Sequence, residues 1–218
     1  MTNKELVTII IVNFNGSDLL VRSVRQAFTS DIPVRVIVSD NASSDNSIRL
    51  LENEFGSDSR LTIIQNGRNL GFSSANNVAL KHAQGDFILF LNPDCLIKPD
   101  TISRLLAVFE EDPGAGMIGA RVLNPDGTEQ KGCRRRVPTP WRTFVRVLGL
   151  SYFTRSTEWL QGFDMSSEPL PDSPVPVDAI SGSLMLVSRK ALDDVGPLDE
   201  GYFLHCEDLD WCMRFNLK

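Results

Sequence analysis

The sequence lacks the features that mark several common classes of protein. Its longest apolar run, residues 7–12 with Thr8 included, has six members, whereas a membrane span needs roughly 20. The N-terminal residues show neither the basic nor the apolar region of a signal peptide. The 4 cysteines form no Cys-x-x-Cys pair, which disfavours a disulfide framework or a zinc ribbon. We therefore expect a cytoplasmic chain in a reducing compartment.

The two common glycine-rich phosphate-binding motifs are also absent. Neither GxxxxGK[ST] nor GxGxxG occurs, which excludes a P-loop and disfavours a dinucleotide-binding fold of the usual kind. A nucleotide bound to this chain would have to be held by side chains and a metal ion instead.

Charge is unevenly distributed along the chain. The 22 basic and 28 acidic residues give a net charge of −6. Residues 131–155 contain seven basic residues and no acid, so the remainder carries a net charge of −13. An acidic body of this kind disfavours nucleic-acid binding by the whole chain.

Strand and helix patterns alternate over the first 125 residues. Apolar or β-branched runs predict strands at 7–12, 34–39, 61–65, 86–91 and 117–122. Helical patterns lie between them, the first capped by Ser17 or Asp18, the second ended by Gly56, the third over 73–83 and the fourth over 100–112. This alternation predicts an α/β fold with a mostly parallel central sheet and flanking helices.

The second part of the chain is less regular. Residues 131–176 begin with basic residues and continue with scattered prolines, as in loops. A strand over 177–187, a short helix over 189–195 and a final helix with an acidic start follow. Within the basic segment, the apolar spacing of Trp141, Phe144, Val145 and Leu148 predicts an amphipathic helix. It would pack on the domain, bind an anionic membrane surface through 134–150, or recruit a partner or a phosphorylated acceptor.

Polar side chains follow three of the predicted strands. Asn13 and Asn15 follow the first strand, Asp40 and Asp45 the second, and Asn92 and Asp94 the fourth. Asp and Asn also form ordinary turns, so each pair alone has a structural explanation. Ligands of parallel sheets nevertheless lie at the carboxyl ends of the strands, and Asn-Pro-Asp offers oxygen ligands suited to Mg²⁺ or Mn²⁺.

A cluster of carboxylates, Glu207, Asp208 and Asp210, opens the last helix. The helix dipole stabilises acidic residues at this end, which is a sufficient structural explanation. Crowding of like charges beside apolar side chains would also raise a carboxyl pKa, as a general base requires.

Taken together, these motifs resemble those of the family 2 glycosyltransferases with the GT-A fold, in particular their rhamnosyltransferase-like branch. The matching segments occur in family order at 9–16 (IIIVNFNG), 38–45 (VSDNASSD), 69–72 (NLGF), 76–77 (NN), 90–94 (FLNPD), 181–183 (SGS) and 203–210 (FLHCEDLD). Residues 131–176 fall outside the resemblance. It implies a nucleotide-sugar-binding half, 1–125, and an acceptor-side half, 126–218, with the basic insert 131–176 and the base motif.

The resemblance also implies roles for individual residues. Asp40 matches the residue that pairs with the nucleotide base, with Asn13 and Asn15 beside it, while Asp45 matches the carboxylate that ties down the second loop. The remaining donor-site matches are Asn69, Gly71 and Asn77. Asp94 matches the metal-binding position for Mg²⁺ or Mn²⁺, and Asn92 stands where the family often has another aspartate. Asp208 matches the general base, with Glu207 as its neighbour.

The implied activity is transfer of a sugar with inversion from a nucleoside-diphosphate donor, with rhamnose from a dTDP donor favoured. The acceptor would be a polysaccharide or a polyprenyl-linked glycan, reached from the cytoplasm or from the inner face of the membrane. One alternative is a sugar nucleotidyltransferase, which should carry a glycine-rich basic loop after its first strand. The other is a non-catalytic nucleotide-sugar-binding protein, since relatives usually continue past the base motif and we expect a C-terminally truncated chain at Lys218.

Overall fold

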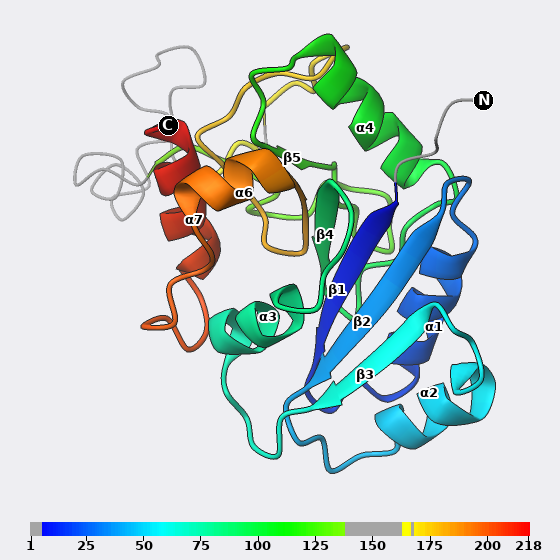
Figure 1. Cartoon of the computed structure of the whole chain (residues 1–218). Helices are drawn as coiled ribbons and strands as arrows, with labels where there is room; N and C mark the ends of the chain where they lie inside the picture. The colour runs from blue at the N-terminus through cyan, green and yellow to red at the C-terminus, as the bar shows by residue number, and fades with distance from the viewer. Residues whose placement is uncertain (1–5, 138–162, 167) are drawn as a thin grey trace.

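The computed structural model describes residues 6–137, 163–166 and 168–218 (Figure 1). The amphipathic pattern predicted around Trp141, and most of the predicted membrane contact 134–150, lie outside the described residues.

A six-stranded sheet forms the centre of the molecule, in the order β3-β2-β1-β4-β8-β5. Its strands are β1 (Val7–Asn13), β2 (Val34–Asp40), β3 (Leu61–Gln65), β4 (Phe87–Leu91), β5 (Met117–Gly119) and β8 (Leu184–Ser188). The first four are parallel to one another, whereas β8 runs antiparallel to both β4 and β5. The mostly parallel sheet predicted from the sequence is confirmed.

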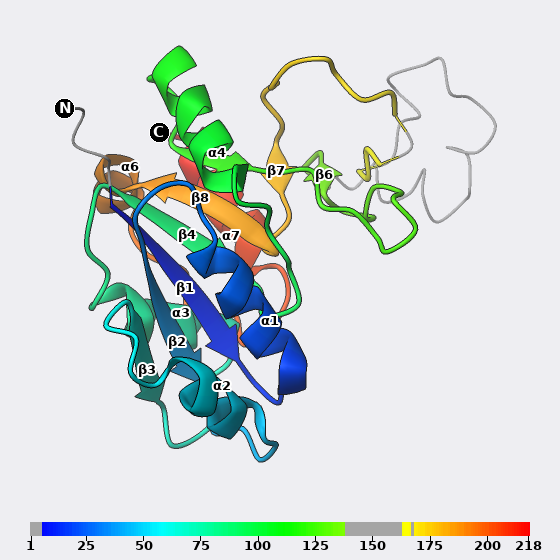
Figure 2. The same ribbon diagram turned by 90° about the vertical axis from the view of Figure 1, so that its right-hand side faces the viewer.

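Helices cover both faces of this sheet (Figures 1 and 2). One face carries α1 (Ser17–Phe28), α2 (Ser47–Phe55) and α4 (Thr101–Glu111), and the other carries α3 (Phe72–Leu80), α6 (Arg189–Val195) and α7 (Glu207–Asn216). Alternate residues of β1 point into the hydrophobic cores on the two faces of the sheet. Ile9 and Ile11 belong to the core that contains α1, whereas Ile10 belongs to the core that contains Trp211. Double burial explains why this strand reads as a continuous apolar run.

The predicted cap of the first helix is wrong. Gly16 is the N-cap and makes no side-chain capping bond. The carboxylate of Asp45, from the loop after β2, instead accepts a hydrogen bond from Ser17 N at 2.8 Å. The free backbone N–H at the start of α1 is therefore bonded by a residue distant in sequence, whereas the local pattern predicted that Ser17 or Asp18 would cap the helix.

The strand predicted over 177–187 is two strands. β7 (Ala179–Ile180) pairs with β6 (Arg134–Arg135) in a separate two-stranded sheet beside the main one (Figure 2), and β8 inserts between β4 and β5. A turn at 181–183 separates them, where a Cβ on Gly182 would lie 3.3 Å from Asp208 Cβ. Apolar patterning could not reveal this break, because it depends on a contact with the last helix.

The strand predicted over 117–122 ends early, at Gly119. Beyond it the chain bonds with 130–133 instead of β8: Gln130 N donates to Val122 O, and Cys133 Sγ donates to Ala120 O. The main sheet thus contains strands from both predicted halves of the chain.

Candidate active site

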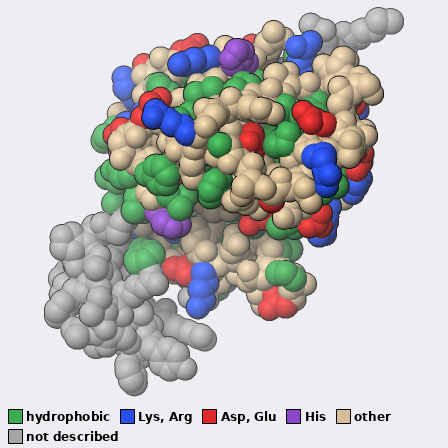
Figure 3. Space-filling view, turned by 90° about the horizontal axis from the view of Figure 1, so that it is seen from below, with side chains coloured by type: hydrophobic (Ala, Val, Ile, Leu, Met, Phe, Trp, Pro, Cys, Tyr) green, Lys and Arg blue, Asp and Glu red, His purple; other side chains and the backbone are tan. Residues whose placement is uncertain are grey.

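A pocket of about 370 Å³ opens at the carboxyl ends of β1, β2 and β4. These strand ends point downward in Figure 1, so Figure 3 views the molecule from this side and shows apolar side chains exposed among polar ones. The pocket is lined by Val12, Phe14, Gly16, Leu19, Asn41, Asn69, Gly71, Phe72, Asn92, Pro93, Asp94, Phe203 and Leu204. Its position agrees with the general rule for ligand sites of parallel sheets.

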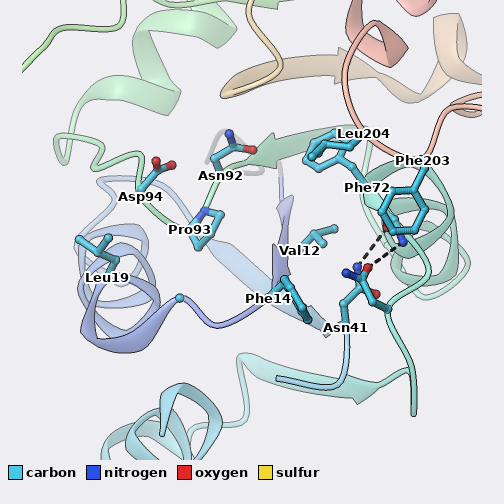
Figure 4. A pocket seen from close by; sticks show the side chains of 13 residues that line it. Val12, Phe14, Leu19, Asn41, Phe72, Asn92, Pro93, Asp94, Phe203 and Leu204 are labelled. Atoms are coloured by element: carbon cyan, nitrogen blue, oxygen red, sulfur yellow. Dashed lines mark hydrogen bonds between the residues drawn. The ribbon is translucent and has the colours of Figure 1, made fainter. Parts of the chain in front are cut away.

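The turn after β4 and a group of large apolar side chains lie on opposite sides of the pocket (Figure 4). Asn92, Pro93 and Asp94 lie on one side, whereas Phe72, Phe203 and Leu204 lie on the other. Phe14, between them, is 53% exposed and Phe203 is 58% exposed. Exposed aromatic rings in a pocket offer faces on which a planar base can stack.

Neither Phe14 nor Phe203 was predicted from the sequence as a site residue. The sequence did contain an indication for Phe14, because an aromatic residue between two Asn residues just after a buried strand is poorly placed to pack in the hydrophobic core. No such signal existed for Phe203, whose place depends on a hydrogen bond from Phe72 N to Phe203 O at 2.8 Å across the fold.

Two of the predicted donor-site asparagines join neighbouring loops. Asn13 is buried, and its Nδ2 donates to Asp40 Oδ1 at 2.8 Å and to Ser47 Oγ at 2.9 Å. Asn15 Oδ1 accepts from Ser44 N at 2.8 Å. The loops after β1 and β2 are therefore fastened together behind the pocket, and neither asparagine lines it.

Asp40 lies in the same network and does not line the pocket either. Its side chain is buried, with Oδ1 accepting from Ser43 Oγ at 2.6 Å and Oδ2 from Ser43 N at 3.1 Å. The adjacent Asn41 lines the pocket and holds its far edge, donating from Nδ2 to Gly71 O at 3.1 Å. Contact between Asp40 and a nucleotide base stays a prediction.

Asp45 joins the second loop to α1. Besides the bond from Ser17, its Oδ1 accepts from Ser47 N at 3.0 Å. Partial burial alone would raise the pKa of Asp45, but the hydrogen bonds from Ser47 and Ser17 outweigh it, and the pKa lies below its ordinary value.

The predicted loop residues separate into two groups. Asn69 and Gly71 line the pocket, and Gly71 has a φ of 83°, with the backbone of Phe203 where a Cβ would stand. Asn77 does not line it; its Nδ2 donates to Leu198 O at 2.8 Å and to Glu200 Oε1 at 3.0 Å. Asn77 thus secures the segment that leads toward Phe203.

The turn after β4 contains the candidate metal ligands. Asp94 is exposed at the pocket wall, and within the described chain its carboxylate has no hydrogen bond or ion pair. The described residues contain no cluster of three or more His, Cys, Asp or Glu that could hold a metal alone. One carboxylate with a neighbouring amide oxygen fits Mg²⁺ or Mn²⁺, because such ions are often completed by the phosphates of a substrate.

The predicted base lies close to this turn. Asp208 Oδ2 accepts from Gly182 N at 3.0 Å, and the next residue in the 181–183 turn, Ser183, accepts from Asn92 N through its carbonyl at 3.0 Å. A short hydrogen-bonded path therefore joins the first turn of α7 to the turn after β4. Asp208 also forms an ion pair with Arg135, whose Nη2 lies 2.5 Å from Oδ2.

Glu207, beside the predicted base, is only 7% exposed, and burial raises its pKa. The role of this helix end as a general base stays a prediction. The Oε2 atom of Glu207 is buried without a hydrogen-bond partner among the described residues.

The described arginines of the basic segment form ion pairs inside the chain. Arg134 pairs with Glu129, Arg135 with Asp208, and Arg136 with Glu168. A membrane contact through 134–150 stays a prediction. In the parts of the chain that the structure describes, no helix is both long enough and apolar enough to cross a bilayer.

The chain is similar in sequence to known glycosyltransferases. Residues 8–196 match the family model described as glycosyl transferase family 2. An N-acetylglucosaminyl-diphospho-decaprenol L-rhamnosyltransferase of Mycobacterium tuberculosis is 29% identical over 195 residues, covering 84% of this chain and 61% of the relative. Rhamnosyltransferase WbbL of Escherichia coli is 28% identical, covering 97% of this chain and 77% of the relative. The chain thus spans less than two thirds of the length of the mycobacterial relative.

Solved structures share the fold. The mannosyltransferase PcManGT from Pyrobaculum calidifontis, in complex with GDP-Man and Mn²⁺, superposes with a TM-score of 0.66 at 20% identity, covering 96% of this chain and 51% of that one. Staphylococcus aureus TarS 1–349 superposes with a TM-score of 0.62 at 17% identity, covering 97% of this chain and 55% of that one. The fold is of the GT-A type, and by its sequence the chain belongs to glycosyl transferase family 2.

Proposed function

We propose that this chain carries the donor pocket and the general base of an inverting glycosyltransferase. The observation that supports it most is the hydrogen-bonded path from Asp208 through the 181–183 turn to Asn92. Asp208 does not itself line the pocket, but this path connects its carboxylate to Asn92 at the pocket wall. The other features of the pocket would suit a nucleoside diphosphate sugar. Family membership and the names of the relatives point to the same activity.

The donor would bind with its base against the exposed rings of Phe14 and Phe203 and its diphosphate toward Asp94. Mg²⁺ or Mn²⁺ held by Asp94 and the Asn92 amide oxygen would neutralise the negative charge of the departing diphosphate. The buried network of Asn13 and Asp40 keeps the loop that carries Phe14 in place before the donor arrives.

Asp208 would remove the proton from an acceptor hydroxyl. The acceptor oxygen forms a bond to the anomeric carbon as the bond from that carbon to the diphosphate oxygen breaks, which inverts the configuration. The proton ends on Asp208, and the electron pair leaves with the nucleoside diphosphate.

Rhamnose from a dTDP donor and a polyprenyl-diphosphate-linked or polysaccharide acceptor are the finer parts of the proposal. The names of two relatives support rhamnose, and one of them names a decaprenol-linked substrate. The dTDP carrier and the polysaccharide acceptor rest on the resemblance of the motifs alone.

The first experiment measures melting temperature with dTDP-, UDP- and GDP-sugars, with and without Mn²⁺. The favoured donor should raise the melting temperature in a Mn²⁺-dependent manner, and Asp94→Ala should remove the Mn²⁺-dependent part. Any binding protein would pass this part of the test.

The second experiment measures turnover of that donor with an N-acetylglucosaminyl-diphospho-polyprenol acceptor. Asp208→Asn should lower kcat by about 10²- to 10⁴-fold while donor binding persists. Asp210→Asn is the matched control, since Asp210 lies in the same helical turn but pairs with Arg214. Binding without turnover in the unaltered chain would favour the non-catalytic alternative. Conversion of the donor by pyrophosphate into a nucleoside triphosphate and a sugar 1-phosphate would favour a nucleotidyltransferase.

A further inference from the structure

The carboxylate of Asp208 is held at three points. Its Oδ2 accepts from Arg135 Nη2 at 2.5 Å and from Gly182 N at 3.0 Å, while Oδ1, among the residues that the structure describes, accepts from Leu209 N alone, at 2.8 Å. A carboxylate has about two lone-pair sites on each oxygen, so these bonds fill Oδ2 and leave one site on Oδ1. Oδ1 is therefore the oxygen with room for a proton from a substrate.

Arg135 is itself fixed from the opposite side. Its backbone belongs to β6, where it is paired with Ala179 of β7, and its Nη2 also donates to the carbonyl of Ile180 at 2.5 Å. The side chains of Arg135 and Asp208 are each only 14% exposed. Such shielding from solvent strengthens the attraction between the two charges and keeps the guanidinium in one orientation.

The two neighbouring arginines provide a comparison within the same segment. Arg134 pairs with Glu129 and Arg136 pairs with Glu168, both outside the last helix. All three arginine side chains are largely shielded, and the ion pair of Arg135 is made with α7, whereas that of Arg134 is made with Glu129. Shielding alone therefore does not distinguish Arg135, whereas its contact with the proposed base does.

The geometry points to Arg135 as a positioning residue for sugar transfer, acting through Asp208. This inference rests on the proposed function, in which Asp208 is the base. The guanidinium stays protonated at all relevant pH values and cannot accept the proton itself. It fixes Oδ2 through its hydrogen bond and ion pair, which leaves Oδ1 to receive the proton of the acceptor hydroxyl.

The test compares Arg135→Gln, Arg135→Lys and the matched control Arg134→Gln in the full 218-residue chain. Turnover is measured with dTDP-rhamnose and the polyprenyl-linked acceptor, and exchange of the Gly182 amide hydrogen is followed without substrate. Arg135→Gln should lower kcat by about 10- to 100-fold, leave the KM for the donor within about twofold, and speed Gly182 exchange. Arg135→Lys should recover part of kcat because it keeps the positive charge.

Arg134→Gln loses an ion pair of the same kind and should change neither kcat nor Gly182 exchange. The inference is overturned if Arg135→Gln matches Arg134→Gln in kcat or in Gly182 exchange, or if Arg135→Gln raises kcat, which would make the pair an inhibitory contact. Retained activity in Asp208→Asn would instead overturn the proposed base. In a chain without turnover, unchanged Gly182 exchange in Arg135→Gln would still contradict the positioning role.

Discussion

Two regions next to the pocket are held by different kinds of interaction. We call them the donor side and the base side after the roles proposed for them; Asn13, Asp40, Arg135 and Asp208 do not themselves line the pocket. The donor side, formed by the loops after β1 and β2, is fastened by hydrogen bonds such as Asn13 to Asp40, between residues 27 positions apart. The base side depends on an ion pair between Arg135 and Asp208, which are 73 positions apart. Within the described chain, five buried side-chain atoms have no hydrogen-bond partner: Nε of Arg135 and Oε2 of Glu207 on the base side, Nη2 of Arg214 in α7, and Oγ of Ser73 and Oδ1 of Asn77 in α3.

None of these atoms lies in the described loops after β1 and β2, so we expect those loops to be in place before a ligand binds, whereas α3 and the surroundings of Asp208 contain unsatisfied groups. Unsatisfied buried polar atoms are uncommon in folded proteins and concentrate where a substrate or an ordered water supplies the missing bond. We expect substitutions on the donor side to change the stability of the fold by removing hydrogen bonds. Substitutions on the base side should also change stability by altering buried charge.

The largest expected effect tests the packing under the base side. Trp211 is fully buried in α7 and meets Phe90 edge to face, with ring centroids 5.0 Å apart. Trp211→Ala should lower the free energy of unfolding by about 3–5 kcal/mol, measured by urea denaturation. Leu217→Ala, at an exposed position just after the same helix, should change it by about 0.5 kcal/mol or less. A small effect at Trp211 would mean that the core does not hold α7 in place.

A smaller effect is expected from the donor-side network. Asn13→Ala should lower the free energy of unfolding by about 1–3 kcal/mol, because Asp40, Ser47 and Gly16 each lose a hydrogen-bond partner. Asn46→Ala is the matched control, since Asn46 is exposed and makes no side-chain capping bond at α2. Equal stability of the two variants would contradict a preassembled donor side.

The smallest effects distinguish the two sides by their dependence on pH. The pKa of Asp45 lies below its ordinary value of 3.8, so its contribution to stability is present above that pH and is lost as pH falls through the lower folded value. Asp45→Asn should therefore lower the melting temperature at neutral pH, and this loss should shrink in acid.

The pKa of Glu207 is raised above 4.5 by burial, so the native state binds more protons and stability falls as pH rises through this window. Glu207→Gln removes that dependence, and its melting temperature relative to the parent should increase as pH rises from 4.5. Melting curves across the pH range check both variants, and a shared sign would refute the contrast between the two sides.

Much of the fold could be predicted from the sequence, because local patterns determine it. The strand at 61–65 and the helix at 189–195 match β3 and α6, since each has an apolar face and clear ends. The edge strand β5 was overestimated because its apolar run continues beyond the residues that pair with β8.

The site was less predictable than the fold. The motifs identified Asn69, Gly71, Asn92 and Asp94, which do line the pocket. They could not show that Asn13 and Asp40 bond to each other behind it, because side-chain direction after a strand depends on the neighbouring loop. The partner of Asp208 was out of reach, since no local pattern relates Arg135 to a helix 73 positions later.

The insertion of β8 between β4 and β5 has a consequence for synthesis of the chain. β5 pairs only with β8 within the described strands, and β4 has no other partner on that side. Until residues 184–188 have left the ribosome, β4 is the edge strand of the partly formed sheet, and this edge is unpaired and strongly apolar. Such an edge readily pairs with other chains, so a fragment cut at the apparent domain boundary near 125 should aggregate instead of folding.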